Sequence, residues 1–166
     1  VRGGSSIGIT RISGPAELEA AVSAAFAQDD AVILEEAIPG FEVGCAVLGN
    51  AVLQTGAVDE IALSGGIFDF EEKYTLKTAE IHCPARISAE KSAEVQEAAK
   101  AIYRALGCRG FARVDLFLTP AGELVFNEVN TIPGLTAHSR YPGMMQAVGL
   151  DFQTLITRMI ELGGEA

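Results

Sequence analysis

Residues 113–134 read RVDLFLTPAGELVFNEVNTIPG, and this stretch constrains the fold more than any other part of the chain. Two runs of apolar residues flank the turn-forming segment 119–122, a pattern that predicts an antiparallel β-hairpin. A hairpin that packs on a core should carry apolar side chains on one face. Four polar residues nevertheless interrupt the two runs: Arg113, Asp115, Glu128 and Asn130.

The spacing of the polar residues indicates that they share one face of the hairpin. If Leu118 pairs with Glu123, side-chain alternation places all four on the face opposite the apolar residues, with Val125 among the buried ones. Asp115 and Glu128 then become diagonal neighbours, with Cβ atoms about 7 Å apart. Two carboxylates at that separation repel each other unless a cation bridges them or one is protonated. The two carboxylates and the neighbouring amide oxygen suit Mg²⁺, and a solvated sheet face is the alternative.

The order of the other elements predicts an α+β fold with an antiparallel sheet and flanking helices. Short strands and hairpins are mixed with helices, without the regular alternation of a doubly wound sheet. Pro39-Gly40 follows a β-like run and marks a boundary between domains 1–38 and 39–166. The expected elements are helices over 15–28, 88–106 and 151–162, a short helix after residue 137, a strand over 31–38 and a hairpin over 41–58.

Composition limits the partners and the compartment. The formal net charge of −10 disfavours a nucleic-acid or anionic-membrane surface. No apolar run is long enough to span a bilayer. The three cysteines lack CxxC spacing, which is typical of reduced core residues in a cytoplasmic protein. We therefore expect a cytoplasmic protein that binds neither nucleic acid nor membranes.

Three loop or boundary segments have the composition of nucleotide-binding elements. The start, RGGSSIG at 2–8, is a candidate phosphate loop, although a flexible terminus has the same composition. The acidic end of the 32–38 run, with Glu42 beyond it, suits an adenine and ribose site, and ordinary strand-end acids are the alternative. The segment 68–74, FDFEEKY, has lid-like content or is an anchored surface loop.

The order of these motifs resembles the C-terminal half of D-alanine–D-alanine ligases, a family with the ATP-grasp fold. The matching segments are RGGSSIG, LEE, EKY, GCRGFARVD, NEVNTIPG and HSRYP, and together they cover essentially the whole chain. NEVNTIPG is the most specific of them. The resemblance implies that 1–38 is a remnant of the central ATP-grasp lobe with its phosphate loop, and that 39–166 is the C-terminal catalytic domain.

The resemblance also implies a reaction that supplies peptidoglycan precursors. ATP phosphorylates the carboxylate of a first D-alanine, and the amine of a second substrate displaces phosphate from the acyl phosphate. By motif position, Asp115, Glu128 and Asn130 would hold two Mg²⁺ ions (or Mn²⁺). Arg113 and the backbone amide of Gly134 would stabilise the tetrahedral oxyanion.

Further positions take roles from the same resemblance. Ser5 in the phosphate loop would bond to Tyr74 when the lid closes, and Lys73 would reach the ATP phosphates. Ser139, which the sequence places near a helix start suited to a carboxylate, would bind the second substrate together with Arg140. The adenine and ribose would be held by Glu35, Glu36, Ile38 and Glu42.

The second substrate depends on the residue after the serine of His-Ser. Housekeeping members usually carry an apolar residue there, whereas this chain carries Arg140, as in the vancomycin-resistance branch. Lactate-using members usually lose the Lys73-Tyr74 pair, which is present here. The resemblance therefore favours a D-Ala–D-Ser ligase, with a D-Ala–D-Ala ligase as the alternative.

The family's N-terminal domain and central-domain lysines have no counterpart in this sequence. We therefore expect that the chain does not ligate by itself, and that the full-length enzyme is a homodimer. Three other functions remain open: a different ATP-grasp ligase, a non-catalytic nucleotide-binding module, and a metal-dependent hydrolase that needs no ATP.

Overall fold

The computed structural model describes residues 7–63, 79–136 and 138–165. The described residues divide into two compact units, with a break between Ile38 and Pro39. The first unit contains residues 7–38 together with Leu63, Ala79 and Glu80. The second contains residues 39–62 and 81–165, including most of the sheet.

The first unit contains a short helical segment and an irregular one. The 3-10 turn η1 (Pro15–Glu17) leads directly into α1 (Leu18–Phe26), so the predicted helix is confirmed. The proline lies at the first helical position, where its missing N–H costs no hydrogen bond. The predicted strand over 31–38 is wrong, because these residues have no regular structure. A β-strand exists only where a neighbour pairs with it, and the sheet begins at Phe41.

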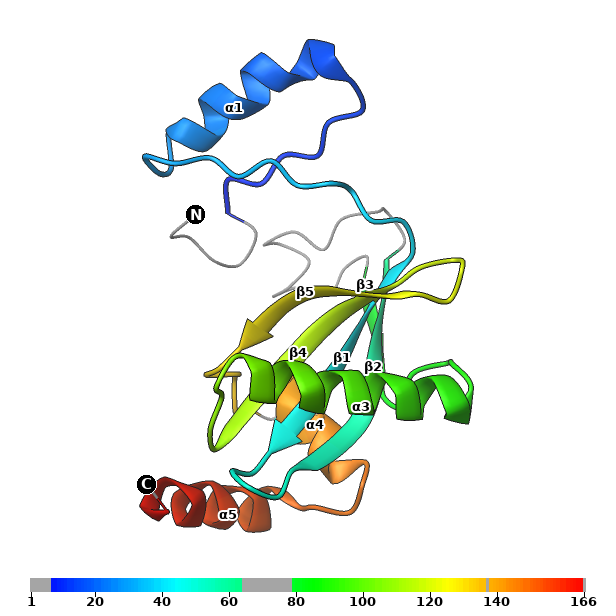
Figure 1. The fold of residues 1–166 in the computed structure, drawn as a ribbon, viewed down its shortest axis with the longest axis vertical. Coiled ribbons are helices and arrows are strands. Elements are labelled where there is room, and N and C mark those ends of the chain that lie inside the picture. The colour runs from blue at the N-terminus through cyan, green and yellow to red at the C-terminus, as the bar shows by residue number, and fades with distance from the viewer. Residues whose placement is uncertain (1–6, 64–78, 137, 166) are drawn as a thin grey trace. The chain divides into compact units, whose positions relative to one another are not determined.

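A five-stranded sheet with strand order β3-β2-β1-β4-β5 organises the second unit (Figure 1). The pairs β1–β2, β1–β4 and β4–β5 are antiparallel. With its flanking helices, the sheet confirms the predicted α+β class. The strands are β1 (Phe41–Leu48), β2 (Gln54–Leu63), β3 (Ala79–His82), β4 (Phe111–Leu118) and β5 (Leu124–Asn130).

Helices cover both faces of the sheet. On one face, α3 (Ala89–Ala105) packs on the alternate residues of β1 and β4, and Val43, Val114 and Leu116 are almost fully buried there. On the other face, α4 (Arg140–Gln146) and α5 (Phe152–Gly164) form a smaller apolar cluster. This second cluster covers only one end of its sheet face, and the polar residues of the hairpin lie beyond it on the same face.

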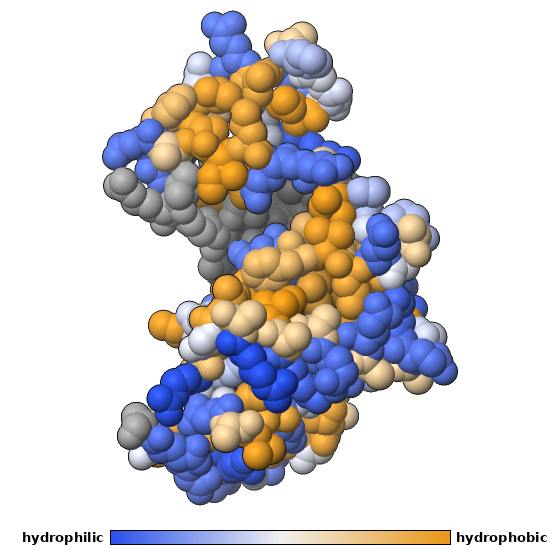
Figure 2. Space-filling model, in the orientation of Figure 1, coloured by the Kyte–Doolittle hydropathy of each residue, from blue (hydrophilic) through white to orange (hydrophobic). Residues whose placement is uncertain are grey.

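The helix α3 begins where the sequence predicted. The Ser88 hydroxyl accepts a hydrogen bond from the Lys91 amide at 3.2 Å, so the serine caps the first turn. Its buried face carries Val95, Ala99 and Tyr103, and the Tyr103 hydroxyl donates to the Gly49 carbonyl. The outward face of α3 is hydrophilic (Figure 2), as expected for an amphipathic helix on a sheet.

The register of the β4–β5 hairpin differs from the prediction. Leu118 pairs with Leu124 rather than Glu123, because the turn is one residue longer. A bulge then leaves Asn127 unpaired between the partners of Leu116 and Asp115. The longer turn and the bulge each reverse the side-chain alternation of β5. The residues of β5 that follow the bulge therefore point to the face that the prediction gave them.

Val125, by contrast, precedes the bulge and pairs with Phe117, so its predicted place on the α3 face is wrong.

Among the three cysteines, all free, Cys45 is buried and Cys108 half-buried, whereas Cys83 is exposed. The expectation of core cysteines is therefore wrong for Cys83. None of the described helices has both the length and the apolar character needed to span a membrane.

One buried carboxylate gives the fold a specific pH dependence. Glu60 is 6% exposed and accepts hydrogen bonds from the Arg86 amide at 2.9 Å and the Arg86 guanidinium at 2.5 Å. These hydrogen bonds from Arg86 lower the pKa of Glu60 below its ordinary value of 4.5. A lowered folded pKa contributes stability that is complete above the unfolded pKa and is lost as the pH falls through the folded pKa.

We expect the free energy of unfolding to fall less steeply below pH 4.5 in Glu60→Gln than in the parent chain. The amide cannot titrate, so the difference between the two chains isolates Glu60 from the other carboxylates. Urea denaturation at a series of pH values between 3 and 7 measures it. Parallel curves for the two chains would contradict the assignment.

Candidate functional site

A row of polar positions crosses four strands of the sheet on the face that α4 partly covers. Asp59 of β2 pairs with Gly44 of β1, Gly44 pairs with Asp115 of β4, and Asp115 pairs with Glu128 of β5. Directly paired residues point to the same face, so three carboxylates line up with one glycine between them. Asp59 and Asp115 have no exposed surface, whereas Glu128 is exposed.

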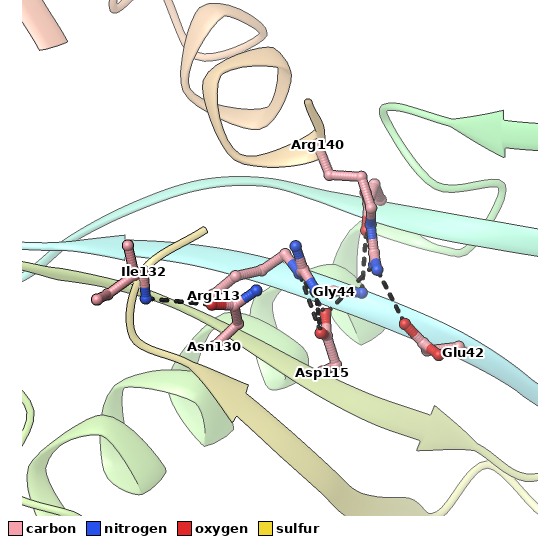
Figure 3. A network of polar contacts seen from close by, with 8 residues as sticks. Glu42, Gly44, Arg113, Asp115, Asn130, Ile132 and Arg140 are labelled. Atoms are coloured by element: carbon pink, nitrogen blue, oxygen red, sulfur yellow. Dashed lines mark hydrogen bonds and ion pairs between the residues drawn. The ribbon is translucent and has the colours of Figure 1, made fainter. Parts of the chain in front are cut away.

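Arg140, the first residue of α4, supplies the positive charge for this row (Figure 3). Its guanidinium donates to both oxygens of Asp59, from Nε at 2.7 Å and from Nη2 at 2.8 Å. Nη1 donates to Glu42 of β1 at 2.9 Å, and Nη2 lies 3.3 Å from Asp115. The Arg140 side chain is only 8% exposed. One arginine thus joins acids from β1, β2 and β4 to the start of α4.

The charges of the row act strongly on one another because they are shielded from water. Burial alone would lower the pKa of Arg140, but the negative charges of Asp115, Asp59 and Glu42 outweigh it and raise that pKa. Burial raises the pKa of Glu42, and the charge of Arg140 only partly offsets this. Arg140 is therefore permanently cationic, and the pKa of Glu42 lies above its ordinary value.

Arg113 holds Asp115 from the same strand. Its Nε and Nη2 donate to the Asp115 carboxylate at 2.8 and 2.7 Å, so this acid contacts two arginines. Arg113 pairs across the hairpin with Asn130, whose side-chain oxygen accepts from the Ile132 amide at 3.1 Å (Figure 3). The predicted convergence of the four hairpin residues on one face is confirmed, with Asp115 and Glu128 directly opposite each other rather than diagonal.

Gly134 and Ser139 come together in the turn that leads into α4. The Ser139 hydroxyl accepts from the Thr136 amide at 3.0 Å and lies 2.8 Å from the Thr136 hydroxyl. A Cβ on Gly134 would lie 2.7 Å from the Ser139 hydroxyl oxygen, so the hydroxyl would have to move to admit a side chain there. Ser139 occupies the N-cap position of α4 without capping it, because its hydroxyl bonds within the turn.

The structure does not test whether the remaining predicted residues join this site. Glu35, Glu36 and Ile38 belong to the irregular segment of the first unit, where both glutamates are exposed and Ile38 is half-buried. Ser5, Lys73 and Tyr74 fall outside the described residues, as do most of the candidate phosphate loop and the candidate lid.

A family model for the C-terminus of D-Ala–D-Ala ligases matches residues 1–161 of the chain. The chain belongs to the D-Ala–D-Ala ligase family. Its fold, a five-stranded antiparallel sheet with flanking helices, is that of the family's ATP-grasp C-terminal domain. The resemblance drawn from the sequence motifs is confirmed.

The names of individual relatives in this family differ, and those that state a second substrate do not all state the same one. The vancomycin C-type resistance protein VanC2 of Enterococcus casseliflavus is 48% identical over 98% of this chain, which covers 46% of that protein. A D-alanine–D-alanine ligase of Chlorobium luteolum is 45% identical over 98% of the chain and 45% of that protein. The crystal structure of the VanG D-Ala:D-Ser ligase of Enterococcus faecalis matches with 60% identity and a TM-score of 0.87, over 96% of this chain and 46% of that one. The chain thus spans about half the length of these relatives.

The oxygen atoms of the hairpin fit the Mg²⁺ that the ligase family implies. Asp115 and Glu128 face each other across the hairpin, and Asn130 lies two residues beyond Glu128 on the same face. Carboxylate and amide oxygens are the donors that Mg²⁺ prefers. Among the described residues no three His, Cys, Asp or Glu side chains are grouped as a metal site, so the fit depends on the amide of Asn130 as third ligand.

Two residues of the polar row were missed from the sequence. Asp59 interrupts the apolar run of β2 as Asp115 interrupts β4, and the same test of an acid within a strand would have found it. Gly44 could not be recognised from the sequence in this way. A glycine within a strand can indicate that another group lies close to it, but which group that is depends on the register with β2 and β4.

Proposed function

We propose that this chain is the C-terminal part of an ADP-forming ligase that joins D-alanine to D-serine. The main support for this proposal is Arg140, whose buried guanidinium lies next to the proposed metal ligands. The chain is also 60% identical to a D-Ala:D-Ser ligase over their matched region. The arrangement supports two tasks in adjacent positions. One is to hold the phosphates of ATP through a metal, and the other is to recognise a polar second substrate.

In the proposed reaction, the carboxylate of D-alanine takes the γ-phosphoryl group of ATP and releases ADP. The amine of the second substrate then attacks the carbonyl carbon, phosphate leaves, and the amine loses a proton. Mg²⁺ supplies charge neutralisation at the phosphate oxygens. Asp115, Glu128 and Asn130 are the proposed ligands, and Mn²⁺ suits the same oxygen atoms.

Arg113 and Gly134 are the proposed stabilisers of the oxyanion that forms on the carbonyl oxygen. Arg113 contacts Asp115 and is largely buried, with 14% of its side chain exposed, so its guanidinium lies at the edge of the proposed metal set. A guanidinium fixed in place before the reaction stabilises developing negative charge without reorganisation. Asp115 holds Arg113 in that position through three hydrogen bonds between the two side chains.

The hydrogen-bond capacity of Arg140 supports serine as the second substrate. A guanidinium has five N–H donors, and three of them donate to Asp59 and Glu42, while Nη2 also forms an ion pair with Asp115 at 3.3 Å. Of the two remaining donors, we assign the one on Nη1 to the hydroxyl of D-serine, which D-alanine lacks. A site built to bond a substrate hydroxyl rejects an analogue without one, because the donor is then left unpaired. Ser139 is proposed to hold the carboxylate of the same substrate.

The nucleotide-binding roles remain proposals from the family motifs. Glu35 and the backbone of Glu36 and Ile38 are proposed for adenine, and Lys73 for the phosphates. Ser5 and Tyr74 are proposed to bond when the lid closes. Glu42, proposed for the ribose, bonds to Arg140 through one oxygen, Oε1, so its other oxygen is the one left for a ribose hydroxyl.

The test is a product assay with a full-length ligase that carries this chain. ATP and D-alanine are supplied with equal concentrations of D-serine and D-lactate, and the dipeptide and depsipeptide products are separated by mass. We expect D-Ala–D-Ser as the main product, with ADP release that depends on Mg²⁺. The chain on its own is expected to release no ADP, because it spans about half of a ligase. D-Ala–D-Ala as the main product would reject the serine assignment.

A housekeeping D-Ala–D-Ala ligase is the second candidate, favoured by the 45% identity to the Chlorobium luteolum enzyme of that name. The product assay separates the two, because both products form from the same mixture. A nucleotide-binding module without catalysis would bind ATP but give neither dipeptide.

A further inference from the structure

Gly44 lies at the centre of the polar row, in the middle of β1. Its neighbours across the sheet are Asp59 and Asp115, and its amide donates to Asp59 at 3.1 Å. The guanidinium of Arg140 lies over this position and reaches an acid on either side (Figure 3). A glycine therefore occupies the strand position over which the arginine is placed.

The backbone of Gly44 does not itself require glycine. Its φ angle lies outside the left-handed region, so any residue can adopt this extended conformation. Glycine inside a strand is otherwise unfavourable, since it loses more conformational freedom on folding than other residues and has no side chain to pack. The reason for glycine at this position must therefore be the space above it.

That space is filled by the charged groups of the site. A Cβ on Gly44 would overlap Nη2 of Arg140, and it would lie 2.7 Å from Oδ1 of Asp59 and 2.8 Å from Oδ1 of Asp115. The three atoms belong to side chains that hold one another by charge-assisted bonds, so none of them moves aside alone. The smallest side chain at position 44 would displace the guanidinium from its place between the two aspartates.

We propose that Gly44 is a specificity-determining position of the ligase, which sets the preference for the second substrate by leaving room for the guanidinium of Arg140. This inference rests on the proposed function, since Arg140 is the group assigned to the substrate hydroxyl. Gly44 is a positioning residue that makes no contact with substrate. Its effect passes through the location of Nη1, the atom whose remaining donor faces the hydroxyl in the proposed function.

The test compares Gly44→Ala with the parent full-length ligase, given ATP, D-alanine and an equal mixture of D-alanine and D-serine as second substrates. We expect the ratio of D-Ala–D-Ser to D-Ala–D-Ala to fall at least about tenfold. The KM for D-serine should rise by more than the KM for ATP, because Arg140 is the group assigned to the hydroxyl of D-serine. An unchanged product ratio would overturn the inference.

Gly56→Ala is the matched control. Gly56 is a buried strand glycine in β2, and its Cβ would lie 2.9 Å from the backbone and the Cβ of Met144 in α4. It also lacks room for a Cβ, but it faces an apolar helix residue instead of Arg140. We expect Gly56→Ala to lower the melting temperature and to leave the product ratio unchanged. A fall in the ratio equal to that of Gly44→Ala would mean that the ratio reports general damage and would overturn the inference.

A combination with Arg140→Met keeps the inference testable if Gly44→Ala folds poorly. Methionine has no guanidinium, so the added Cβ no longer meets Nη2. In the Arg140→Met background, Gly44→Ala should therefore lower the stability less than it does in the parent chain. It should also leave the product ratio of Arg140→Met unchanged. Equal destabilisation in both backgrounds would overturn the inference. If the parent ligase makes no D-Ala–D-Ser at all, the proposed function itself fails, a result distinct from an unchanged ratio in Gly44→Ala.

Discussion

Replacing Arg140 with methionine is expected to lower the free energy of unfolding of the chain by about 3–5 kcal/mol. Methionine keeps most of the volume of the arginine stem and removes only the charged group. Asp59 then loses both of its bonds to the guanidinium and keeps only the 3.1 Å bond from the Gly44 amide. A carboxylate with no exposed surface and no cation is costly, because it lacks both water and an ion partner.

The effect should be specific to the buried network. The matched control is Arg158→Met in α5, where the arginine is 50% exposed and lies 3.7 Å from Glu161. Exposed pairs of this kind contribute about 0–1 kcal/mol. The chain has no tryptophan, so urea denaturation is followed by circular dichroism.

A second variant separates the lost charge pair from lost packing. Adding Asp59→Asn to Arg140→Met removes the unpaired negative charge with almost no change of shape. The double variant should recover at least about half of the lost stability, since the two residues are coupled. A loss below about 1 kcal/mol in the single variant, or no recovery in the double one, would contradict the role given to this pair.

Local sequence patterns predicted most of the helices and strands, but neither the irregular segment 31–38 nor the register of the hairpin. The alternation in 113–118 predicted which face carries Arg113 and Asp115, because strand periodicity is a property of the sequence itself. The bulge at Asn127 was not predicted, since the same residue type occurs at the regularly paired position 130 and does not by itself mark a bulge. The predicted face of Glu128 was correct because the longer turn and the bulge together shift the register by two residues.

The Arg140 network shows why the candidate site was only partly predictable. Asp59 and Arg140 are separated by 81 residues and meet only when β2 and α4 lie on the same sheet face. The sequence indicated Arg140 through a family motif, as a contact for substrate. The structure adds that most of its donors are held by acids of the protein, so its position depends on three strands at once. Contacts of this kind are set by tertiary packing, which no local pattern contains.

Replacing Glu128 with glutamine is expected to lower the kcat of the full-length ligase about 100-fold while leaving the stability of the chain within about 0.5 kcal/mol. Glu128 is exposed, and no hydrogen bond or ion pair joins it to another residue in the described part of the chain. The fold therefore loses nothing when its charge is removed. The proposed metal site loses one of two carboxylates, and a loss of about 3 kcal/mol of transition-state stabilisation corresponds to about 100-fold in rate.

Glu123→Gln is the matched control, because Glu123 is an exposed glutamate at the turn of the same hairpin. Its variant should keep full kcat and full stability. Steady-state kinetics at several Mg²⁺ concentrations should show a raised Mg²⁺ requirement in Glu128→Gln alone, and Mn²⁺ binding followed by electron paramagnetic resonance should weaken in parallel. Normal kcat and Mn²⁺ binding in Glu128→Gln would remove this carboxylate from the metal site. Asp115 and Asn130 would then be too few protein ligands to distinguish a built metal site from a solvated, arginine-paired sheet face.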